Sequence, residues 1–170
     1  LQWLTGMRPG EVISMRASEI MSLPDGSMVY QPVEHKTAHK GKVRNIYLGP
    51  KAQAIASPWL SEAEEDGGDF LFSPRREMLK GRSRKRSKNR IPGATYSVHS
   101  YSEAIYRACD RANVERFSPN QLRHAFATDV EAKMGYAKAR AAMGHTTIDT
   151  TAIYVDDDRK SAAEVAQLMG

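Results

Sequence analysis

The sequence has one cysteine and no long hydrophobic run. Because Cys109 has no second cysteine to pair with, an internal disulfide is excluded, and its helical surroundings favour a role in core packing. Crossing a bilayer would take about 20 consecutive apolar residues, and the first residues lack the pattern of a signal peptide. We therefore expect a cytoplasmic protein with no membrane contact.

Metal-ligand patterns are also missing. The five histidines and the single cysteine are scattered and show no ligand spacing. We predict that the protein needs no metal ion and no other cofactor.

The composition is that of an ordinary globular chain, and 170 residues with 41% hydrophobic and 26% charged content suit one compact domain. The net charge of +5 is unevenly distributed, because nine of the 25 basic residues and only one acidic residue lie between Arg75 and Arg90. Judged by charge alone, this segment is equally well explained as a solvated loop or as a contact for a polyanion.

Turn-forming residues divide the chain into short elements. Gly6 can end a truncated first helix, and Pro9 suits the first turn of a second helix. The patterns predict strands over 28–33 and 43–48, joined by a lysine-rich hairpin turn. They also predict helices over 50–65 with a break at Pro58, over 97–113, from 118 onward, over 136–143, from 146 through Tyr154, and over 161–169.

Three residues attract attention because of their positions. Arg8 lies at the corner before the second helix, where N–H groups and a guanidinium could meet an anion, although a surface arginine at a helix cap is the commoner explanation. Tyr154, viewed alone, is more often a half-buried aromatic residue than a nucleophile, and His145 alone is more often a capping or surface histidine. Their roles are inferred from the motifs in which they occur together.

Four motifs in order resemble those of the tyrosine recombinases, the family of phage integrases and Xer-like proteins. They are residues 5–11 with Arg8, Lys36-Thr37 followed by residues 44–48, residues 122–128 with Arg123, and Gly144-His145 with Thr151 and Tyr154. The resemblance covers essentially the whole chain. It implies an α+β fold that is mainly α-helical, with a small antiparallel β-sheet at one edge. It also implies that residues 1–170 are a single catalytic domain, and that an N-terminal core-binding DNA domain is missing from this chain.

The resemblance implies a role for each matched residue. Arg8 and Arg123 would clamp the non-bridging oxygens of a DNA phosphodiester, and Tyr154 would attack the phosphorus and form a 3′-phosphotyrosyl bond. Lys36 would protonate the departing 5′ oxygen, with Lys40 or Lys42 as alternatives. His145 would take part in proton transfer. The sequence departs from the family pattern at Asn120, where a histidine is usual, and an amide cannot accept a proton at neutral pH.

Further cations are predicted to contact DNA, and they contribute affinity rather than sequence recognition. They are Lys40, Lys42, Arg44, Arg82, Arg84, Lys85, Arg86, Lys88 and Arg90. The expected partners are double-stranded DNA and three further copies of the chain, in a homotetramer that exchanges its C-terminal helices. In that arrangement an apolar stripe of Ala162, Val165, Ala166 and Met169 would dock on a neighbouring protomer, with Asp156-Asp157-Asp158 before it as a polar hinge or cap. Packing of this stripe in cis on its own domain is the alternative. The protein would associate with the nucleoid.

The predicted function is therefore site-specific DNA recombination, in which strands are cleaved and rejoined without metal or ATP. The sequence leaves two alternatives open. One is a nicking and closing enzyme similar to type IB topoisomerases, which would use the same residues. The other is a DNA-binding module that has lost cleavage, for which Asn120 is the supporting feature.

Overall fold

A computed structural model describes residues 1–34, 43–80, 92–144 and 153–169, with the side chains of the last helix described from residue 161 onward. The elements, in chain order, are α1 (Gln2–Thr5), α2 (Pro9–Ile13), a 3₁₀ turn η1 (Ala17–Glu19), β1 (Ile20–Ser22), β2 (Met28–Tyr30), β3 (Ile46–Leu48), α3 (Pro50–Glu65), α4 (Pro74–Leu79), α5 (Val98–Ala112), α6 (Pro119–Met134), α7 (Tyr136–Met143) and α8 (Ile153–Met169). This mainly helical fold with one small sheet confirms the predicted fold class.

The sheet has the order β1-β2-β3, and both pairs of neighbouring strands are antiparallel. Tyr30 pairs with Ile20 on one side and with Ile46 on the other, so β2 is the central strand. The hairpin of β2 and β3 was predicted from the sequence, although both strands are shorter than expected. Strand β1 was not predicted, because three residues carry too little alternation to distinguish a strand from a turn.

Helix α3 is continuous, whereas the sequence predicted a break at Pro58. A proline inside a helix leaves the carbonyl four residues earlier without its usual donor. That residue, Ala54, is exposed, as is Pro58 itself, so water can solvate the carbonyl. The buried residues Ala52, Ala56 and Ala63 then hold both halves of the helix against the domain.

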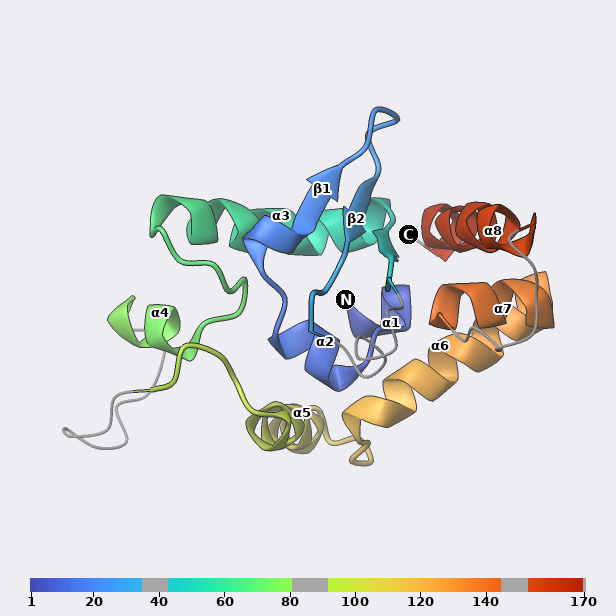
Figure 1. Ribbon diagram of the computed structural model, residues 1–170. Helices are drawn as coiled ribbons and strands as arrows, with labels where there is room; N and C mark the ends of the chain where they lie inside the picture. The colour runs from blue at the N-terminus through green and yellow to red at the C-terminus, as the bar shows by residue number, and fades with distance from the viewer. Residues whose placement is uncertain (35–42, 81–91, 145–152, 170) are drawn as a thin grey trace.

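The hydrophobic residues form two clusters. The first joins α1, α2, the sheet and α3, and contains Met7, Met15, Tyr30, Leu48 and Leu71, among others. The second joins α6, α7 and α8, which lie together on the right of Figure 1, and contains Phe126, Val130, Met143, Val165 and Met169, among others. Helix α1 contacts α6 and α8 and thereby connects the two clusters.

The C-terminal helix packs on its own domain. The stripe predicted to bind a neighbouring protomer, namely Ala162, Val165, Ala166 and Met169, is buried in this single chain. Helix α8 also runs without interruption from Ile153, so Asp156-Asp157-Asp158 lies inside the helix and forms neither the predicted hinge nor the predicted cap.

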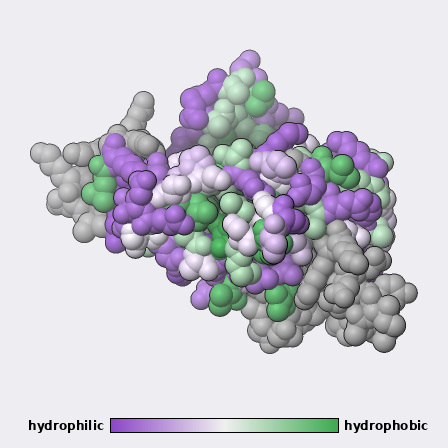
Figure 2. All heavy atoms as spheres, turned by 90° about the horizontal axis from the view of Figure 1, so that it is seen from above, coloured by the Kyte–Doolittle hydropathy of each residue, from purple (hydrophilic) through white to green (hydrophobic). Residues whose placement is uncertain are grey.

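The surface seen in Figure 2 carries hydrophobic residues in small groups among hydrophilic ones. Among the described helices, none is long and apolar enough to cross a membrane. Cys109 is buried in α5, which agrees with its predicted packing role.

Candidate active site

Arg8 is the N-cap residue of α2, and Pro9 follows in the first turn, as the sequence predicted. The Glu11 carboxylate folds back onto this corner. Its Oε2 accepts the backbone N–H of Arg8 at 2.6 Å, and its Oε1 accepts Nη1 of the Arg8 guanidinium at 2.8 Å. Arg8 is therefore held by a buried carboxylate while 26% of its side chain stays exposed to solvent.

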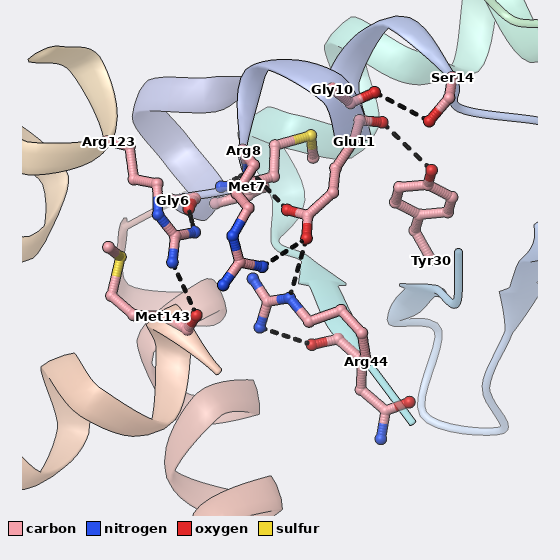
Figure 3. A network of polar contacts seen from close by, with 12 residues as sticks. Gly6, Met7, Arg8, Gly10, Glu11, Ser14, Tyr30, Arg44, Arg123 and Met143 are labelled. Atoms are coloured by element: carbon pink, nitrogen blue, oxygen red, sulfur yellow. Dashed lines mark hydrogen bonds and ion pairs between the residues drawn. The ribbon is translucent and has the colours of Figure 1, made fainter. Parts of the chain in front are cut away.

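Arg123 reaches the same place from α6. Its Nη1 donates to the carbonyl oxygen of Gly6, and its Nη2 donates to the carbonyl oxygen of Met143 at 2.9 Å. These bonds join the corner before α2 to the C-terminal end of α7 (Figure 3). Only 7% of Arg123 is exposed, and both acceptors are fixed main-chain atoms, so the guanidinium has a defined orientation.

Arg44 is the third guanidinium of the site, and it lies just before β3. Its Nε is 3.6 Å from Oε1 of Glu11, and its Nη1 is 3.4 Å from the carbonyl oxygen of Ala142. Only 5% of Arg44 is exposed. Arg44 is thus enclosed between Glu11 and the end of α7, and its predicted contact with DNA stays a prediction.

The charges of this arginine cluster, defined as Arg8, Arg44 and Arg123 with Glu11, do not balance. Burial, followed by repulsion from Arg8 and Arg44, lowers the pKa of Arg123 to about 10. Burial alone would raise the pKa of Glu11, but attraction from Arg44 and the contacts with Arg8 outweigh it and hold that pKa below its usual value. Within this cluster three cations share one anion, and an anionic ligand would relieve their repulsion.

The other predicted site residues are less fully placed. Asn120 is exposed on the first turn of α6, one helical turn before Arg123. Tyr154 belongs to the first turn of α8, but its side chain lies outside the described part. Entirely outside the described residues are Lys36, Lys40, Lys42, Arg82, Arg84, Lys85, Arg86, Lys88, Arg90 and His145.

Two basic residues at the start of the cation-rich segment have structural partners. Arg76 is buried, and it contacts Asp66 at 2.8 Å and the carbonyl oxygen of Leu71 at 3.0 Å. Lys80 pairs with Glu62 at 3.0 Å. These two side chains stabilise α4 against the end of α3, a role that their position in a cationic run did not predict.

No role of Glu11 was predicted from the sequence. Its signal was present, because an N-cap residue followed three positions later by a glutamate has the spacing of a capping box. The pairing of Glu11 with Arg44 had no comparable signal, because the two residues are far apart in the chain and only the tertiary fold brings them together.

The fold and the cluster define a helical domain with a cationic site at the junction of its two hydrophobic clusters. Residues 1–161 match the phage integrase family. The chain is 27% identical over 154 residues to tyrosine recombinase XerC of Haemophilus ducreyi, an alignment that covers 89% of this chain and 46% of that protein. A solved structure of XerH site-specific recombinase, bound to its difH substrate in a pre-cleavage complex, has a TM-score of 0.58 at 20% identity, over 94% of this chain and 40% of that one.

The chain belongs to the phage integrase family, as the order of its motifs predicted. It spans about half the length of the curated relative that it matches.

Proposed function

We propose that this chain is the catalytic domain of a site-specific DNA recombinase that cleaves and rejoins strands through a 3′-phosphotyrosyl intermediate. The observation that supports this most strongly is the arginine cluster. Two arginines from separate motifs, Arg8 and Arg123, lie together in a cluster whose single carboxylate does not balance its cations. A phosphodiester is an anion of suitable chemistry, and arginine forks match its oxygens.

In the proposed reaction, the phenol oxygen of Tyr154 attacks the phosphorus, and the bond between phosphorus and the 5′ oxygen breaks. Negative charge grows on the non-bridging oxygens, where Arg8 and Arg123 would stabilise it. Lys36 would give a proton to the 5′ oxygen, and the phenol proton would pass to His145 or to a phosphate oxygen, since Asn120 cannot accept it. Attack by a 5′ hydroxyl on the phosphotyrosine reverses these steps.

Two features supply what a metal ion gives in other phosphoryl transfers. The guanidinium groups carry permanent positive charge, and the carbonyl acceptors of Gly6 and Met143 fix Arg123 before substrate arrives. Such preorganised charge costs no rearrangement during the reaction.

The proposed partner is double-stranded DNA. XerH site-specific recombinase is bound to difH substrate in its solved structure, and the basic residues around Lys40 and between Arg82 and Arg90 would supply phosphate contacts in this chain. We also propose that the protein acts in the cytoplasm, at the nucleoid.

Assembly into a homotetramer with exchanged C-terminal helices belongs to the same proposal. Because α8 is packed in cis here, exchange would require its buried stripe to leave one domain and occupy the same groove of another. Truncation after Asp158 tests this. Loss of cooperative assembly with retained cleavage of single sites supports exchange, whereas unfolding of the monomer shows that α8 serves only its own domain.

Covalent trapping tests the proposed reaction. Duplexes with randomised sequence and a single nick would be incubated with the chain, so that cleavage near the nick releases a short fragment and prevents resealing. We expect a denaturant-resistant protein–DNA adduct with wild type and none with Tyr154→Phe, which keeps the ring but lacks the attacking oxygen. Binding without an adduct would instead identify a DNA-binding module.

The recovered DNA would then serve as a defined substrate. Joining of strands from two different duplexes distinguishes a recombinase from an enzyme that only nicks and closes one duplex. A supercoiled plasmid that is relaxed without any intermolecular joining would contradict the recombinase proposal.

A further inference from the structure

The C-terminal end of α7 is held by two arginines from different parts of the chain. The carbonyl oxygen of Ala142 accepts from Arg44 at 3.4 Å, and that of the next residue, Met143, accepts from Arg123 at 2.9 Å. The last carbonyls of a helix have no partner within the helix and carry partial negative charge. The end of α7 therefore serves as a common support for both guanidinium groups.

Arg44 also contacts the other side of the cluster. Oε1 of Glu11 lies 2.8 Å from Nη1 of Arg8 and 3.6 Å from Nε of Arg44. The carboxylate thus lies between the two guanidinium groups (Figure 3). Through this contact Arg44 connects α7 to the residue that holds Arg8.

Gly144 shows how closely Arg44 fits against α7. It ends the helix in the left-handed conformation with φ 63°. A Cβ at this position would overlap the Nη1 of Arg44 and would lie 2.9 Å from its Cζ. Arg44 therefore occupies the space that a side chain at position 144 would need.

The burial of Arg44 is difficult to explain by stability alone. Its Nε and Nη2 are buried and make no hydrogen bond within the described part of the chain. Replacing a buried ion pair by apolar side chains is often neutral or stabilising, so such a pair is weak evidence for a purely structural role. The geometric effect of Arg44, by contrast, is direct, because its guanidinium contacts both the Glu11 carboxylate and the C-terminal end of α7.

We propose that Arg44 is a positioning residue, which braces Glu11 against the end of α7 and thereby fixes the Arg8 and Arg123 guanidinium groups relative to each other. The catalytic consequence rests on the proposed function. Arg44 itself does not touch the DNA in this arrangement, in contrast to the contact predicted from the sequence.

The first experiment separates positioning from DNA contact. Arg44→Met removes the charge and keeps a side chain of similar length, and Arg44→Lys keeps the charge. Arg16→Met is the matched control, because Arg16 pairs with Asp69 away from the arginine cluster. DNA affinity and the single-turnover cleavage rate would be measured on the trapped substrate. We expect Arg44→Met to cleave about 10- to 100-fold more slowly, since small misplacements of catalytic groups have effects of this size.

Binding by Arg44→Met should stay within about twofold of wild type, because the phosphate-contacting cations remain. Arg44→Lys should recover most of the lost rate, and Arg16→Met should match wild type in both measurements. Equal losses of binding and cleavage in Arg44→Met would show a direct DNA contact and overturn the proposal. Unchanged cleavage would overturn it as well.

The second experiment needs no DNA and tests the link to α7 by unfolding. Gly144→Ala should push the Arg44 guanidinium away, whereas Gly67→Ala is a control at nearly the same φ, 61°, with open space around the added methyl. We expect Gly144→Ala to lower the melting temperature by about 3 °C more than Gly67→Ala does, a shift typical of modest destabilisation in a domain of this size. In an Arg44→Met background this difference should disappear.

Negative results of the two experiments would contradict different parts of the inference. Absence of an adduct with wild type would refute the proposed function and the catalytic part of the inference, while the unfolding cycle would still report the link between Arg44 and Gly144. If the extra effect of Gly144→Ala persists in Arg44→Met, the contact does not brace α7 and the inference is wrong, whatever the DNA experiments show. If Arg44→Met does not fold, Gly144→Ala replaces it in the cleavage assay, and a rate equal to that of Gly67→Ala would overturn the proposal.

Discussion

Arg123 donates a hydrogen bond to the carbonyl oxygen of Gly6, two residues before Arg8. Through this single contact the two arginine motifs, which lie far apart in the sequence, share one site. Each arginine can then act on the same anion, and loss of either should remove an interaction that the other cannot replace.

We expect Arg8→Ala and Arg123→Ala each to slow single-turnover cleavage by about 10²-fold or more, as loss of an oxyanion donor does. Binding should fall much less, because affinity comes from many phosphate contacts. Rates and affinities on the trapped substrate would be compared for both variants. A loss confined to binding would mean that these arginines only anchor phosphates.

Asn120→His tests the departure from the family pattern. An imidazole titrates near neutrality and could accept the phenol proton, which is typically worth about 10²–10⁴-fold when the geometry is right. We expect a gain within about tenfold, because a histidine also needs a partner that fixes its tautomer. Cleavage rates between about pH 5.5 and 8.5 would reveal a new inflection between about pH 6 and 7. A large fall in rate would show that the amide is itself required.

Gly6→Ala should destabilise the domain more than Gly67→Ala does. Both glycines have positive φ, 62° and 61°, so both variants carry the same backbone strain of about 1–2 kcal/mol. The Cβ at Gly6 would also overlap the ring of Phe126, and such overpacking typically costs a further ~1–3 kcal/mol. Urea denaturation would measure the free energy of unfolding. Equal effects would show that Phe126 can move aside.

Glu11 should make stability depend on acid pH. Burial raises its pKa, but Arg44 and Arg8 outweigh this effect, so the folded value lies below the ordinary 4.5. A carboxylate with a lowered pKa stabilises the folded state above its unfolded pKa, and that contribution is lost as the pH falls through the folded pKa. Wild type should therefore lose stability below about pH 4.5, and Glu11→Gln should be less stable at neutral pH with a flatter acid dependence. Parallel curves for the two proteins would contradict this assignment.

Local signals in the sequence determined the elements that carry the site. Gly6 and Gly144 end helices because glycine adopts positive φ at little cost, and Pro9 begins α2 because its ring fixes a helical φ. The order of the motifs also identified the family, since residue types with a defined chemistry at defined separations do not depend on knowing the fold.

Tertiary structure alone decided how these elements meet. Burial of Ala52, Ala56 and Ala63 keeps α3 continuous through Pro58, and the fit of α8 against α7 buries in cis a stripe whose spacing equally allowed docking on a neighbour. In the sequence, Arg44 could not be distinguished from the other cations of the lysine-rich hairpin. It became a buried partner of Glu11 only because the tertiary fold brings it between Glu11 and the carbonyl oxygen of Ala142. No local pattern encodes a contact between residues so far apart in the chain.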